Sequence, residues 1–148
     1  MKIIDIETWK RKEHFEFFSL LQSPYFGIVT EVDCTETHQF AKDKNESFFA
    51  HYLHKSMIVV NKIEEFKYRI IDDEVVVFDV LHAGSTIGRK DGTFGFSFME
   101  FSEDFEIFNK KLQKEIDEVQ NSTGLRVKNE DLPENHVRHS TMPWTHFT

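Results

Sequence analysis

The chain has 148 residues, of which 39% are apolar and 30% charged, so it is long enough for one globular domain with a substantial core. Its net charge of −8 repels phosphate backbones and argues against nucleic-acid binding. A single cysteine, Cys34, and the lack of a long apolar run near residue 1 predict a cytoplasmic protein with neither signal peptide nor membrane span.

The first elements expected are a helix and a strand. Residues 8–22 have the composition of a helix, with Thr8 as a candidate N-cap and Pro24 after its end. Residues 26–35 alternate and are rich in β-branched side chains, which predicts a strand.

Two helices and a hairpin are expected next. Thr35 opens a short helix over 35–44, and residues 46–63 form a longer helix whose broad apolar surface indicates deep burial. Residues 66–82 contain two strand-like runs separated by Asp72 and Asp73, a pattern typical of a tight hairpin.

The remaining elements are a strand, an amphipathic helix and a final strand. Residues 92–101 are expected to be a strand, and Ser102 is expected to cap a helix over 102–120. A last strand is expected from about residue 139. Three rings fall at period two and therefore share one face of the strand: Phe94, Phe96 and Phe98.

These elements predict a single α+β domain over residues 1–148, with a mixed or antiparallel sheet and helices packed on one side. The sixteen phenylalanines need a large core, a pocket or a subunit interface to be buried in.

The chemistry-bearing side chains do not specify a reaction by themselves. His51 and His54, and again His136 and His139, have a spacing that zinc ligands use, but neither pair has a cysteine or acidic companion at ligand spacing. We therefore expect hydrogen-bonded or surface histidines and no metal site. Cys34, late in a predicted strand, is expected to be a small buried residue rather than a nucleophile.

Five stretches, in this order and spacing, resemble motifs of the chloramphenicol acetyltransferases. The resemblance extends along essentially the whole chain, and these stretches carry it: WKRKEHFEFF (9–18), VDCT (32–35), FKYRIIDDEVVVFDVLH (66–82), TFGFSFMEFSEDFEIF (93–108) and PENHVRHSTMPWTHFT (133–148).

The resemblance implies a mixed β-sheet flanked by helices and a homotrimer with its active sites between subunits. It also implies transfer of acetyl from acetyl-CoA to an antibiotic hydroxyl, with no metal. In this family a catalytic histidine of one subunit faces a pocket formed largely by the next.

Residue roles can be carried over at matched positions. Ser140 resembles the serine that hydrogen-bonds the oxyanion of the tetrahedral intermediate, and Arg11 and Trp144 match structural positions. Phe18 replaces a tyrosine of several members, and Arg138 stands where members often have a small polar residue. The positions implied to bind substrate are Phe17, Phe18, Tyr25, Phe26, Thr86, Phe94, Phe96 and Arg138.

The family's catalytic motif, His-His-x-x-x-Asp-Gly, does not occur in these 148 residues. The sequence is therefore expected to be a shortened form of the family fold, incomplete at its C-terminal end. Without the histidine that takes the acceptor's proton, this chain is expected to be inactive, and Arg11 to lack its aspartate partner.

Two other functions are compatible with the sequence. The chain could be a non-catalytic oligomer that binds or sequesters a small aromatic or nucleotide-like ligand in clefts between subunits. Alternatively, it could have a structural or protein-interaction role in which the phenylalanines serve assembly.

Overall fold

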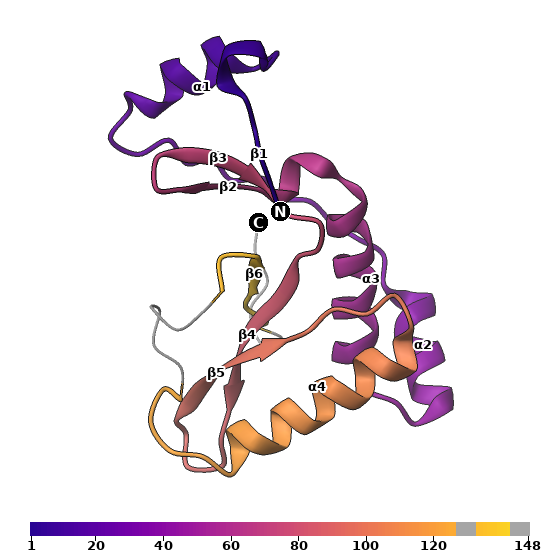
Figure 1. The fold of residues 1–148 in the computed structure, drawn as a ribbon. Coiled ribbons are helices and arrows are strands. Elements are labelled where there is room, and N and C mark those ends of the chain that lie inside the picture. The colour runs from indigo at the N-terminus through magenta and orange to yellow at the C-terminus, as the bar shows by residue number, and fades with distance from the viewer. Residues whose placement is uncertain (127–132, 143–148) are drawn as a thin grey trace.

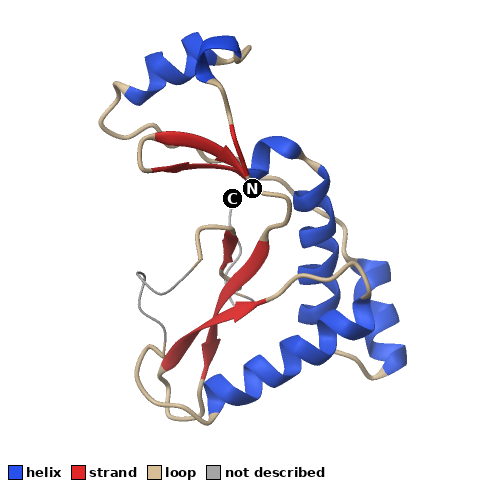
Figure 2. Cartoon of the chain, in the orientation of Figure 1, coloured by secondary structure: helices blue, strands red, loops and turns tan. Residues whose placement is uncertain are grey.

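The computed structural model describes residues 1–126 and 133–142. These residues form four α-helices, two short 3-10 helices and six strands in two three-stranded sheets (Figures 1 and 2). The elements follow the order β1 (Lys2–Ile3), η1 (Ile6–Thr8), α1 (Lys12–Ser19), α2 (Thr35–Lys44), α3 (Phe48–Lys62), η2 (Glu64–Lys67), β2 (Tyr68–Ile71), β3 (Glu74–Val77), β4 (His82–Gly88), β5 (Phe94–Met99), α4 (Phe105–Gln120) and β6 (His136–His139).

The first sheet has the order β1-β3-β2 and is antiparallel throughout. Its β2–β3 turn is made by Asp72 and Asp73, whose φ angles of 49° and 65° lie in the left-handed region. A two-residue turn of this kind matches the twist of the flanking strands. The predicted hairpin is therefore confirmed, and Figure 1 shows it beside α1 at one end of the molecule.

The second sheet has the order β5-β4-β6 and is mixed, because β4 pairs antiparallel with β5 and parallel with β6. Helices α3 and α4 pack against one face of this sheet (Figure 1). The main buried cluster lies between the sheet and these helices and consists of Ala50, Leu53, Met57, Leu81, Ala83, Met99, Phe108 and Leu112.

The phenylalanines of β5 occupy the opposite face, as the alternation predicted. Gly95, Ser97 and Met99 are buried, whereas the rings between them are more exposed. Thr86 of β4 pairs with Phe96, so its side chain projects from the ring-bearing face. This face carries three of the side chains that the resemblance assigned to a substrate pocket, those of Thr86, Phe94 and Phe96.

The N-cap of α4 differs from the one predicted, whereas the start of α2 agrees with the prediction. Asp104, not Ser102, caps α4, because its Oδ1 accepts a hydrogen bond from the Ile107 amide. The Ser102 carbonyl instead accepts a hydrogen bond from His54 Nε2. Helix α2 begins at Thr35 and ends at Lys44, as predicted, and Asp33 Oδ1 accepts a hydrogen bond from the Thr35 amide.

The N-terminal helix is shorter than the predicted 8–22. The Thr8 hydroxyl donates to the Asp5 carboxylate at 2.9 Å, which ends a 3-10 turn instead of opening an α-helix. Helix α1 then begins at Lys12 and ends at Ser19, where the Ser19 hydroxyl donates back to the Phe15 carbonyl.

The strand predicted over 26–35 is wrong. Residues 22–34 have no regular structure, and Ile28 and Val29 are 80% and 74% exposed. Strand-forming side chains produce a strand only where a partner supplies ladder hydrogen bonds, and none of the six described strands pairs with this segment. The prediction of α3 is confirmed. Strand β6 spans His136–His139, so it ends where the last strand was expected to begin, and residues 143–148 of that expected strand lie outside the described residues.

Within the described ranges, no helix is long and apolar enough to cross a membrane.

Candidate functional site

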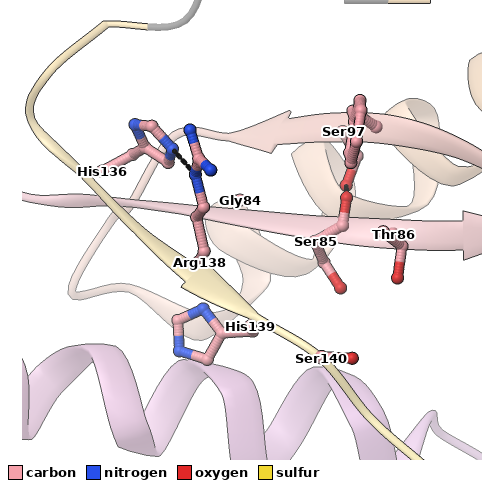
Figure 3. A pocket seen from close by; sticks show the side chains of 9 residues that line it. Gly84, Ser85, Thr86, Ser97, His136, Arg138, His139 and Ser140 are labelled. Carbon is pink, nitrogen blue, oxygen red and sulfur yellow. Dashed lines mark hydrogen bonds between the residues drawn. The ribbon is translucent and has the colours of Figure 1, made fainter. Parts of the chain in front are cut away.

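A cavity of about 200 Å³ lies where β4, β5 and β6 meet (Figure 3). Its walls come from segments far apart in the sequence, brought together by the parallel pairing of β6 with β4. The lining residues are Gly84, Ser85, Thr86, Phe96, Ser97, His136, Arg138, His139 and Ser140.

Four of the residues expected at the substrate and oxyanion positions line this one cavity: Thr86, Phe96, Arg138 and Ser140. Thr86 and Phe96 face each other across the β4–β5 pair, and Gly84 pairs with Arg138 across the β4–β6 pair. Ser140 follows directly after the end of β6.

Ser140 is exposed, and within the described part of the chain its side chain makes no hydrogen bond. The next residue is held in place, because the Thr141 hydroxyl hydrogen-bonds the Tyr52 hydroxyl of α3 at 2.5 Å. Burial raises the pKa of Tyr52, and this hydrogen bond opposes the rise. Ser140 therefore has a fixed backbone on either side and a hydroxyl that can donate to a bound molecule.

Arg69 of β2 connects the two sheets and orients the start of β6. Its Nε and Nη2 donate to the backbone carbonyls of Glu134 and His136 at 3.0 and 2.9 Å, and Nη1 donates to those of Phe66 and Tyr68. Burial lowers the pKa of the guanidinium. Sequence reasoning missed this residue, because its partners are backbone carbonyls, which leave no pattern in the amino-acid sequence.

Two histidines near the cavity have lowered pKa values, in both cases mainly because of burial. His82 Nδ1 accepts a hydrogen bond from the Phe101 amide at 3.0 Å, a role available only to an unprotonated nitrogen. His139 Nδ1 donates to the Val137 carbonyl at 3.0 Å. Burial thus favours the neutral form of both rings, and in His82 the accepting Nδ1 favours it further.

The other aromatic residues expected at the substrate site do not line this cavity. Phe17, Phe18, Tyr25 and Phe26 are 63%, 52%, 89% and 88% exposed in the N-terminal part of the chain. Phe94 lies next to the cavity and packs edge-on against Phe96, with ring centroids 5.8 Å apart.

The residues expected to have structural roles are placed as follows. Arg11 forms an ion pair with Glu65 at 2.7 Å, so this chain supplies it with a carboxylate partner. Trp144 lies outside the described residues.

The histidine pair of α3 is explained by packing. His51 Nε2 and Glu46 Oε2 are 2.6 Å apart, and the His51 ring stacks on Phe105. No group of three potential metal ligands occurs among residues 1–126 and 133–142. Cys34 is partly exposed beside α2, so the expectation that it is buried is wrong.

Comparison with known proteins identifies the family. The family model described as chloramphenicol acetyltransferase matches residues 1–148. A Bacillus pumilus chloramphenicol acetyltransferase is 31% identical over 143 residues, which cover 96% of this chain and 64% of that protein. Chloramphenicol acetyltransferase 3 of Escherichia coli is 26% identical over 144 residues, which cover 97% of this chain and 67% of that protein.

The fold agrees with these similarities. A solved structure of a chloramphenicol acetyltransferase superimposes with a TM-score of 0.92 and 35% identity, covering 100% of this chain and 72% of that one. The chain spans less than two thirds of the Bacillus pumilus relative. The match over all 148 residues shows that this chain belongs to the chloramphenicol acetyltransferase family.

Proposed function

We propose that this chain provides the acceptor side of an acetyltransferase site, at which acetyl passes from acetyl-CoA to the hydroxyl of a small molecule. The observation that carries the proposal is the convergence of Thr86, Phe96 and Ser140 on one cavity. These are three positions at which the sequence matches the acceptor and oxyanion sites of its family.

The chemistry assigns Ser140 a defined role. The acceptor oxygen attacks the thioester carbonyl while a general base takes the hydroxyl proton. The Ser140 hydroxyl donates to the resulting oxyanion, and the intermediate collapses as the CoA thiolate leaves and takes up the proton. The family's His-His-x-x-x-Asp-Gly base motif is not among these residues, and we propose that none of the 148 residues serves as the base.

Titration of the chain with chloramphenicol tests the acceptor site. We expect binding that Thr86→Trp abolishes by filling the cavity, whereas Thr123→Trp, at an exposed position that does not line the cavity, leaves it unchanged. If chloramphenicol does not bind, or binds equally well to Thr86→Trp, the acceptor-site proposal is wrong.

Thiol release from acetyl-CoA tests the assignment of the base. The 148-residue polypeptide assayed alone is expected to show no acetyl transfer above the uncatalysed rate. Turnover that survives purification and is lost in a Ser140→Ala variant would show that a group within this sequence serves as the base.

A non-catalytic binding function is the second candidate, and the missing base motif favours it. In that case the protein sequesters a small aromatic or nucleotide-like ligand. Acetyl-CoA separates the two candidates, because the transferase function requires both acetyl-CoA and chloramphenicol to bind, whereas sequestration requires only one ligand. If neither these compounds nor nucleotides bind, the remaining candidate is a structural role.

We further propose that the protein is a cytoplasmic homo-oligomer, a trimer as in its family. Support comes from the apolar residues between α1 and α2, several of which are more than two-thirds exposed in the single chain: Leu20, Tyr25, Phe26, Ile28, Val29 and Val32. So many neighbouring apolar side chains in water are typical of a subunit interface.

A further inference from the structure

Ser140 lies just beyond the part of the chain that the second sheet holds. Strand β6 ends at His139, which pairs with Ser85 of β4 (Figure 3). Ser85 is itself fixed, because its carbonyl accepts a hydrogen bond from the buried Ser97 hydroxyl at 2.9 Å. The pairing of β6 with β4 does not extend to residues 140–142. The sheet therefore fixes the chain up to His139 and not the residue that follows.

A contact from α3 reaches this segment instead. The hydroxyls of Tyr52 and Thr141 are hydrogen-bonded at 2.5 Å across 89 positions of the sequence. Among residues 1–126 and 133–142, no other hydrogen bond joins residues 140–142 to the rest of the chain. Since consecutive Cα atoms are about 3.8 Å apart, fixing Thr141 also confines the residue before it. Ser140 thus lies between one neighbour held by β4 and another held by Tyr52.

Packing fixes the Tyr52 ring before its hydroxyl forms this hydrogen bond. Phe48 and Phe49 pack edge-on against the ring, with centroids 5.2 and 5.4 Å away. Tyr52 also packs against the main buried cluster between the sheet and the helices. A side chain that packing has already ordered loses little further conformational entropy when it forms a hydrogen bond. The position of α3 is thereby passed on to Thr141.

We propose that Tyr52 is a positioning residue of the acceptor site, whose hydrogen bond to Thr141 holds the Ser140 hydroxyl where a bound acceptor can receive it. The inference rests on the proposed function and adds a residue that no motif of the sequence indicated. Tyr52 does not line the cavity beside Ser140, so it acts through its neighbours in space. A hydroxyl donor is effective only when it is preorganised, at about 3 Å from the atom it stabilises. Releasing Thr141 lets Ser140 leave that position.

Calorimetric titration of the full chain with chloramphenicol tests the role of Tyr52. Tyr52→Phe removes only the hydroxyl and should weaken binding by roughly two- to tenfold, the range that one hydrogen bond contributes. Thr141→Val removes the other partner and should have the same effect. Tyr68→Phe is the matched control, because its hydroxyl also donates a hydrogen bond, to Glu64 at 2.7 Å, but lies at the first sheet. Its affinity should equal that of the wild type.

A double-mutant cycle shows whether Tyr52 acts through Ser140. Ser140→Ala should itself weaken chloramphenicol binding, and adding Tyr52→Phe should weaken it little further, because the positioned hydroxyl is already gone. A general structural role of Tyr52 would instead make the two effects multiply. Urea unfolding tests the contact without a ligand: Tyr52→Phe, Thr141→Val and their double variant should lower the midpoint equally, since each removes the same hydrogen bond.

The outcomes separate this inference from the proposed function. If the wild type does not bind chloramphenicol, the acceptor site and the role of Tyr52 both fall. If the wild type binds it, the acceptor site stands and the role of Tyr52 is wrong in any of three cases. These are unchanged affinity in Tyr52→Phe, an effect of Tyr52→Phe that persists in full in Ser140→Ala, and additive losses of the urea midpoint in the Tyr52 and Thr141 variants.

Discussion

Arg69 links the first sheet to the start of β6, since its guanidinium donates to four backbone carbonyls, two of them at Glu134 and His136. We expect Arg69→Lys to lower the free energy of unfolding by about 1–3 kcal/mol, because a lysine cannot reach all four carbonyls and leaves some without a partner. Urea denaturation measures the change.

The matched control is Arg11→Lys. Arg11 makes one exposed ion pair, with Glu65, and pairs of this kind contribute about 0–1 kcal/mol. The idea that Arg69 holds the sheets together fails if the two substitutions cost the same. It gains support if Arg69→Lys also weakens chloramphenicol binding while Arg11→Lys does not.

His82 makes stability depend on pH. Burial lowers its folded pKa below 6.5, partly opposed by the Glu100 carboxylate and reinforced by Lys111. The unfolded chain therefore binds a proton more readily, and stability falls as pH drops below about 6.5 until the folded pKa is reached. His139 shifts in the same direction. Urea midpoints at pH 7.5 and 5.5 should show this loss.

His82→Asn isolates the contribution of one imidazole. The amide oxygen of asparagine can accept the Phe101 amide in place of Nδ1 but does not titrate. This variant should lose less stability between the two pH values than the wild type. His14→Asn, at an exposed position of α1, should lose as much stability between the two pH values as the wild type. If both variants lost equally little, the pH dependence could not be assigned to His82.

Among the elements, α4 offers a direct test of a cap that the sequence alone misplaced. Asp104→Ala should lower the free energy of unfolding by about 1 kcal/mol, because it leaves the Ile107 amide without its acceptor. Ser102→Ala should have little effect, since Ser102 uses only its backbone carbonyl, toward His54. If urea unfolding showed that Ser102→Ala destabilises the protein more than Asp104→Ala, Ser102 would be the cap, as the sequence predicted.

The elements also show what a sequence can and cannot predict. Helix α4 and strand β5 are predictable from the sequence because the side chains that pack in the core recur with the period of each element, as Leu112 and Met99 illustrate. Residues 26–35 mislead because strand propensity describes side chains that suit a paired strand, not the presence of a partner. Local capping chemistry was the other source of error, as Thr8 shows, since its hydroxyl bonds Asp5.

At the scale of the whole molecule, only part of the candidate site could be predicted from the amino-acid sequence. Motif resemblance brought Thr86, Arg138 and Ser140 to attention, and the parallel β4–β6 pairing places them on one cavity. No pattern in the sequence indicated the parallel pairing or the Arg69 bridge, because both depend on contacts between residues more than fifty positions apart. The phenylalanine excess left a core, a pocket and an interface open, and Phe17 and Phe26 are exposed in the single chain.

The segment between α1 and α2 supports the last prediction, which concerns assembly. Tyr25 and Phe26 are nearly fully exposed in the single chain, and burying two such rings would stabilise an interface by several kcal/mol, at roughly 2–3 kcal/mol each. Sedimentation velocity should therefore show an oligomer, and the Tyr25→Ser/Phe26→Ser double variant should shift it toward the monomer. Ile70→Ser is the control, because Ile70 is also exposed, at 63%, but lies on β2. If the wild type sediments as a monomer at tens of micromolar, the proposed assembly is wrong. If only Ile70→Ser dissociates the oligomer, the interface lies on the first sheet and not at residues 25 and 26.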